Sequence, residues 1–146
     1  MIALFIAVLF ASPPAADTPE ALIQSLYARD RPGQDKSLNW CDKKTISRFA
    51  DARLTALFIK DCQCAKRTGE ICQLDSDPFY NAQDFDTADP NPRINQIAAN
   101  TYAVTITNFG DQKLIYKMTK TSAGWRISDI EWPEDKSSLV KLLSTK

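Results

Sequence analysis

Apolar residues in the first half of the chain recur three and four positions apart, as on one face of a helix. Residues 18–30 show this pattern, with Thr18 as an N-cap and Pro19 at the first helical position. The predicted inward face comprises Leu22, Ile23, Leu26 and Tyr27. We therefore expect an amphipathic helix that ends before the breaker-rich segment 31–37.

Three more helices follow from similar patterns. Residues 41–50 form a second helical region, and Asp51 can cap a third helix over residues 52–66. The third helix would turn Leu54, Leu57 and Phe58 inward. Residues 137–144, near the end of the chain, predict a short last helix.

After residue 90 the period of the apolar residues changes from helical to two, which is typical of half-buried strands. The inward residues would be Tyr102, Val104, Ile106, Leu114, Tyr116 and Met118. Residues 108–111 predict a hairpin turn, and residues 125–132 predict another strand. Short connections between consecutive strands favour an antiparallel sheet. The sequence predicts one α+β domain over residues 17–146, with N-terminal helices packed on a curved antiparallel sheet of about four strands.

The N-terminal segment 1–16 resembles a secretory signal peptide. Residues 2–11 are wholly apolar, and small residues and prolines follow them before Asp17. The apolar run is shorter than the roughly 20 residues that a membrane-spanning helix needs. A buried N-terminal strand is the alternative. We expect cleavage near Asp17 and a mature periplasmic or secreted protein without a membrane span.

Four cysteines lie at positions 41, 62, 64 and 72, and an even number in an exported chain favours two disulfides. A bond between Cys62 and Cys64 would be badly strained, because one residue separates them. Two pairings remain, each joining Cys72 to one of these two cysteines and Cys41 to the other. A zinc site is disfavoured by the spacing.

Charge and composition exclude several classes of function. Lys plus Arg and Asp plus Glu each total 18, so the net charge is zero and nucleic-acid binding is not expected. The chain has no histidine, which excludes histidine-dependent triads and His-ligated zinc. Its four glycines form no nucleotide-binding motif. We expect no cofactor and no metal.

The stretch 72–85, CQLDSDPFYNAQDF, carries the densest candidate chemistry. It fails as a calcium-binding EF-hand loop, because the position that requires glycine is Tyr80. The alternatives are a looser oxygen site formed by Asp75, Asp77 and Asp84, or a catalytic carboxylate pair. The favoured interpretation is structural: Asp77 caps a short helix that starts at Pro78, and Phe79 and Ala82 face the core.

Parts of this sequence resemble a family of exported bacterial domains of unknown function with a D-P-F-x-x-A-Q-D motif, here residues 77–84. The segment Gly124-Trp125-x-Ile127 and the final helix extend the resemblance over residues 19–143. It implies a cone-shaped, nuclear-transport-factor-2-like fold with a pocket inside the curved sheet. Candidates for the concave face are Tyr102, Tyr116, Trp125 and Ile127. The resemblance implies no catalytic residues.

The favoured function is that of an exported, non-enzymatic binding or accessory domain for an unknown protein or small-molecule partner. One alternative is a periplasmic immunity or inhibitor protein against a secreted cell-wall hydrolase toxin. Another is an enzyme that uses carboxylates in the cone pocket. The candidate ligand- or partner-binding residues are Asp77, Tyr80, Gln83, Asp84, Tyr116 and Trp125.

Overall fold

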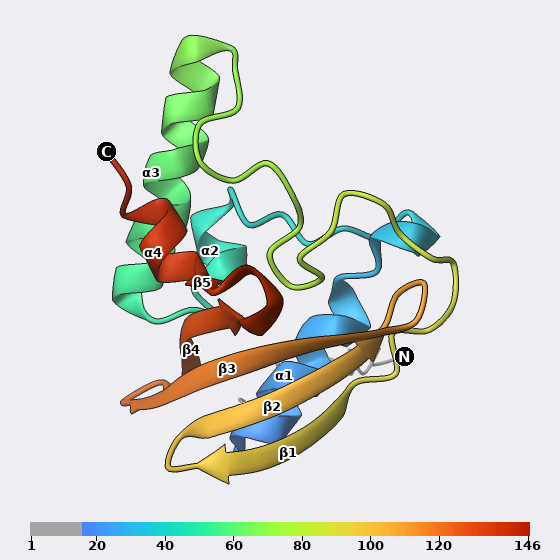
Figure 1. Cartoon of the computed structure of the whole chain (residues 1–146). Coiled ribbons are helices and arrows are strands. Elements are labelled where there is room, and N and C mark those ends of the chain that lie inside the picture. Colours follow the sequence, from blue (N-terminus) through green and yellow to red (C-terminus); the bar gives the residue numbers. More distant parts are fainter. Residues whose placement is uncertain (1–15) are drawn as a thin grey trace, which may run out of the picture.

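The structure is a computed structural model that describes residues 16–146, and it confirms the predicted α+β class. The helices come first: α1 (Pro19–Arg29), the 3₁₀ helix η1 (Pro32–Gln34), α2 (Lys43–Ile46) and α3 (Ala52–Thr68). The sheet and the last helix follow: β1 (Arg93–Ala98), β2 (Thr101–Thr107), β3 (Asp111–Thr121), β4 (Gly124–Trp132), η2 (Pro133–Asp135), β5 (Ser137–Ser138) and α4 (Leu139–Leu143). Figure 1 shows α1 against the sheet, with α3 and α4 side by side at the β4–β5 end.

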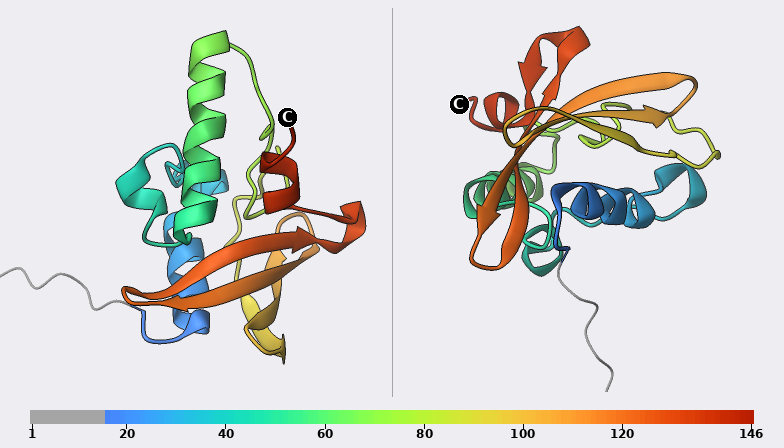
Figure 2. Two further views of the ribbon diagram at one scale, coloured as in Figure 1. Left: turned by 90° about the vertical axis from the view of Figure 1, so that its left-hand side faces the viewer. Right: turned by 90° about the horizontal axis from the view of Figure 1, so that it is seen from below.

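The sheet contains five antiparallel strands in the order β1-β2-β3-β4-β5, rather than about four. Irregular pairing between Lys117 and Met118 and between Gln96 and Ala98 adds local twist. Figure 2 shows the resulting curvature, with the β3–β4 hairpin running at a steep angle to α3 and past its end. Tyr102, Tyr116 and Ile127 on the inner face belong to the hydrophobic core. Side chains therefore fill the concave side at these positions.

Helix α1 forms as predicted. The Thr18 hydroxyl oxygen accepts a hydrogen bond from the Ala21 amide at 3.1 Å. The four predicted inward residues are buried with Pro19. The chain leaves the helix at Asp30, whose amide still donates to the Leu26 carbonyl. Asp30 is fully buried, which is exceptional for a carboxylate.

The segment between α2 and α3 attaches the helices to the sheet. Helix α2 spans only four residues, so most of the predicted second helical region is turn. The Ile127 amide donates to the Phe49 carbonyl, and the Asp51 amide donates to the Ile127 carbonyl. The Asp51 side chain then caps α3 by accepting from the Leu54 amide at 2.8 Å, as predicted. The start of α3 is thereby fixed beside β4.

Helix α3 carries both disulfides on its C-terminal half. Cys41 pairs with Cys62, and Cys64 pairs with Cys72, which is one of the two pairings left open by the sequence. The described residues contain no free cysteine. One bond ties the 31–42 segment to α3, and the other ties the start of the long 69–92 loop to the same helix.

The Asp77–Ala82 segment is a turn, so the predicted short helix is wrong. Asp77 and Ala82 pair through their backbones as an isolated antiparallel bridge that closes the turn. Asn81 takes a positive φ of 49°, which ends any helical path. The inward position of Phe79 is nevertheless confirmed, because this side chain is buried in the core.

The predicted signal peptide lies almost wholly outside the described residues, which begin at residue 16. Within residues 16–146, no helix combines the length and the apolar character needed to cross a membrane.

Candidate functional site

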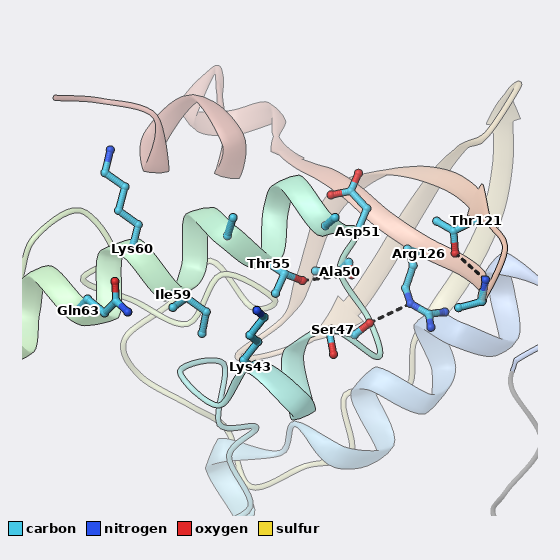
Figure 3. Close-up of a pocket in the computed structure, with 13 residues that line it drawn as sticks. Lys43, Ser47, Ala50, Asp51, Thr55, Ile59, Lys60, Gln63, Thr121 and Arg126 are labelled. Carbon is cyan, nitrogen blue, oxygen red and sulfur yellow. Dashed lines mark hydrogen bonds between the residues drawn. The ribbon is translucent and has the colours of Figure 1, made fainter.

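A groove of about 580 Å³ lies between α3, α2 and the turn that joins β3 to β4 (Figure 3). Its apolar lining includes Ala50, Ala52, Ala56, Ile59 and Ala123. Ala52 and Ala56 lie on α3, and their methyl groups project little from the helix surface. An apolar ligand segment can therefore approach the helix closely.

Arg126 on β4 is held in place at one end of this groove. Its Nε donates to the Ser47 carbonyl at 2.9 Å, and its Nη1 donates to the Trp125 carbonyl at 2.7 Å. These bonds fix the guanidinium before any ligand arrives, which lowers the entropic cost of binding. Within residues 16–146, no hydrogen bond from its Nη2 is found, so this edge of the guanidinium is available to an anion.

The charges around the groove are mainly positive. Lys43, Lys60 and Arg126 line it, whereas Asp51 is its single carboxylate and caps α3. The ion pairs found in the described part of the chain include none of these three cations. Figure 3 shows the Lys60 amine directed away from Lys43 and Arg126. Arg126, which is held at one end of the groove, is therefore the better place for a ligand anion.

A second pocket, of about 500 Å³, lies between the 31–42 segment and the 69–92 loop. Its apolar residues include Trp40, Leu74, Phe85 and the exposed Ile71. Trp40 neighbours Cys41, and Ile71 neighbours Cys72. The two disulfides thus hold the opposite walls of this pocket against α3. Asp77 and Gln83 of the predicted site residues also line it.

Asp77 is almost completely buried and faces the side chain of Asp30. Its Oδ1 accepts from the Phe79 and Tyr80 amides at 2.8 and 3.3 Å. Burial and then the negative charge of Asp30 raise the pKa of Asp77 to about 9. Burial also raises the pKa of Asp30. The capping role predicted for Asp77 is thus joined by a carboxyl pair that the sequence did not predict.

Tyr80 and Tyr116 are buried rather than open to ligand. The Tyr80 hydroxyl donates to the Asp30 carbonyl at 2.8 Å. The Tyr116 hydroxyl lies 2.7 Å from that of Tyr27. Burial is the main cause that raises the pKa of both residues, so both phenols are neutral at ordinary pH.

The other predicted site residues lie apart from one another. Gln83 and Asp84 are exposed, and the Gln83 side chain donates to the Asp75 carbonyl at 3.3 Å. Trp125 lies on β4, where the Lys120 amine stands 5.8 Å from its ring centroid. The six predicted residues therefore do not converge on one site: two line the second pocket, and the groove includes none of them.

The sequence pattern does not predict Lys43, Arg126 or Asp30 as site residues. An isolated lysine or arginine carries no pattern that predicts a groove, because Ser47 and Arg126 meet only in the folded chain. Asp30 follows a helix, where an aspartate normally indicates a solvent-exposed turn. The missed signal was the Trp-Arg-Ile order of residues 125–127, which places Arg126 on the face opposite to the buried Ile127.

No cluster of three or more His, Cys, Asp or Glu side chains in residues 16–146 is arranged to hold a metal ion. Comparison of the chain with protein-family models, curated proteins and solved structures found no significant match. The family resemblance seen in residues 77–84 therefore stays a prediction.

Proposed function

We propose that the protein is an exported binding domain that takes an amphipathic organic anion in the groove between α2, α3 and the β3–β4 turn. The anionic group would lie at Arg126, and the apolar part would lie along Ala56 and Ile59. The observation that carries this proposal is the fixed guanidinium of Arg126 at the end of an apolar groove.

The ligand chemistry follows from the lining. An arginine held at Nε and Nη1 offers its remaining N–H groups to a carboxylate or phosphate oxygen, and such charge-assisted hydrogen bonds are strong. The alanines and Ile59 contribute hydrophobic burial. A small inorganic anion would gain only the hydrogen bonds to Arg126, and a neutral hydrocarbon would gain only the hydrophobic burial. The groove favours ligands that combine both.

Export is supported by the disulfides. Two of them tie α3 to flanking segments, and such bonds persist in oxidising compartments outside the cytoplasm. A periplasmic or secreted location agrees with the apolar N-terminal segment of the sequence.

The burial and the hydrogen bonds of Asp30 and Asp77 favour a binding function over carboxylate catalysis. The Oδ1 atoms of Asp77 and Asp30 already accept backbone hydrogen bonds, and neither residue is appreciably exposed. A general acid must come within hydrogen-bonding reach of its substrate. The geometry of the pair instead suits a role inside the core.

Isothermal titration calorimetry tests the proposal with three probes: decanoate below its micellar concentration, decan-1-ol and acetate. We expect saturable binding of decanoate and binding at least about tenfold weaker for the other two, because each lacks one of the two interactions. Absence of decanoate binding, or equal affinity for decan-1-ol, would contradict an amphipathic-anion site.

A further inference from the structure

The side chains of Asp30 and Asp77 meet in the core between the end of α1 and the 69–92 loop. Each uses its Oδ1 on the backbone: that of Asp30 accepts from the Leu38 amide at 2.8 Å, and that of Asp77 accepts from the Phe79 amide. The Oδ2 of Asp30 is fully buried and has no hydrogen-bond partner among residues 16–146. A buried carboxylate oxygen without a donor is costly.

The nearby hydroxyl protons are already used. Tyr27 donates to the Phe79 carbonyl at 2.6 Å, so the hydrogen bond between Tyr27 and Tyr116 takes its proton from Tyr116. Tyr80 donates to the backbone carbonyl of Asp30. The indole of Trp132 donates to the Pro78 carbonyl. None of these groups can therefore supply the missing donor to Asp30 Oδ2.

Among residues 16–146, no ion pair joins a cation to Asp30 or Asp77. The titratable groups that face it are Tyr27 on α1, Tyr80 on the loop and Tyr116 on β3. Arg31 follows Asp30 in the chain, but its Nη1 pairs with Asp89 at 3.1 Å and its Nε donates to the Tyr27 carbonyl. Two adjacent buried negative charges without a cation would repel each other strongly.

We propose that Asp30 and Asp77 form a buried proton-binding site, in which Asp77 carries a proton and donates it to the Oδ2 of Asp30. The pair then holds a single negative charge. The Oδ1 atoms of both residues accept from backbone amides, and the Oδ2 of Asp30 accepts from Asp77. Burial and the neighbouring carboxylate favour protonation of Asp77, in line with its pKa of about 9.

This proton holds the 69–92 loop to the end of α1. Asp77 starts the turn that carries Phe79 and Tyr80 into the core, and Asp30 ends α1. Loss of the proton at alkaline pH would place two charges next to each other and loosen the wall of the second pocket that Asp77 lines. At neutral and acidic pH the proton stays bound, and this wall of the second pocket keeps the packing seen in the structure.

Carbon-detected NMR titration of the aspartate carboxyl groups in the wild-type chain tests the site without any variant. We expect the Asp77 carboxyl carbon to titrate near pH 9. Ordinary titration of both Asp30 and Asp77 near about pH 4 would overturn the proposal.

Asp77→Asn provides a second readout, because its amide can donate to Asp30 and still accept from Phe79 and Tyr80. We expect this variant to abolish the alkaline titration step, whereas Asp75→Asn, in the same pocket lining, leaves it in place. Persistence of that step in Asp77→Asn would show that another group carries the proton.

Discussion

The hydroxyl of Tyr27 on α1 lies 2.7 Å from that of Tyr116 on β3 and donates to the Phe79 carbonyl on the 69–92 loop. One phenol thus joins the first helix, the sheet and the long loop. All three residues are buried.

Within the described residues, the Tyr27 hydroxyl forms two hydrogen bonds, whereas the Tyr116 hydroxyl forms one. Tyr27→Phe leaves both the Phe79 carbonyl and the Tyr116 hydroxyl without a partner, whereas Tyr116→Phe removes a single donor to Tyr27. Each unsatisfied buried group costs about 1–3 kcal/mol. We expect Tyr27→Phe to lower the free energy of unfolding by about 2–4 kcal/mol and Tyr116→Phe by about 1 kcal/mol. Urea denaturation measures both, and equal losses would contradict the bridging role of Tyr27.

Asp77→Ala tests the turn that replaces the predicted helix. The substitution leaves the Phe79 and Tyr80 amides without their acceptor. We expect a loss of about 2–3 kcal/mol, more than the roughly 1 kcal/mol of an ordinary exposed N-cap. Asp77→Asn keeps the acceptor and serves as the matched control. A loss of 1 kcal/mol or less for alanine would mean that the segment tolerates the missing cap.

The buried acids also give stability a specific pH dependence. The pKa of Asp77 is raised to about 9 in the folded state, so between about pH 4 and pH 9 the folded chain holds more protons than the unfolded chain. The free energy of unfolding therefore falls as pH rises, by at most about 1.4 kcal/mol per pH unit for one proton.

Urea denaturation at about pH 5.5, 7 and 8.5 measures this slope. The slope should shrink in Asp77→Asn, whose amide does not ionise, and persist in Asp75→Asn. Stability that rises over this range in the wild-type chain would contradict a protonated Asp77.

The disulfides should contribute similar amounts of stability. They close loops with sequence separations of 21 and 8 residues, for which loop-closure entropy predicts about 3.3 and 2.5 kcal/mol. Denaturation of two double Cys→Ala variants, one at Cys41 and Cys62 and one at Cys64 and Cys72, measures the contribution of each disulfide to the free energy of unfolding. A much larger loss for the shorter loop would show that this bond acts on the folded state and not through chain entropy.

Local patterns in the sequence predicted the elements but not the sites. Thr18 and Asp51 cap helices as expected, and the alternation around Tyr116 gives the right inward face, because capping and periodicity depend on neighbouring residues. The prediction of a helix after Asp77 was wrong because an Asp-Pro pair also starts turns.

The two sites depend on contacts between distant parts of the chain. Asp30 and Asp77 are 47 positions apart (77 − 30), and Arg126 donates to a carbonyl 79 positions away. Neither relationship leaves a local pattern. Tyr80 and Tyr116 are candidate binding residues by sequence, but their hydroxyls form hydrogen bonds within the core.

In the proposed function, Arg126 holds the anionic group of the ligand. Arg126→Gln removes the charge, and Lys113→Gln removes a charge on an exposed residue outside the groove. A lost charge-assisted hydrogen bond costs about 1.5–3 kcal/mol, or roughly tenfold to 100-fold in affinity. The most direct measurement is titration of both ¹⁵N-labelled variants and the wild type with decanoate, followed by NMR. We expect shifts at Ala50, Ala56 and Arg126 in the wild type, the same affinity for Lys113→Gln, and at least about tenfold weaker binding for Arg126→Gln. Equal affinity of Arg126→Gln and the wild type, or shifts confined to residues outside the groove, would contradict this role of Arg126.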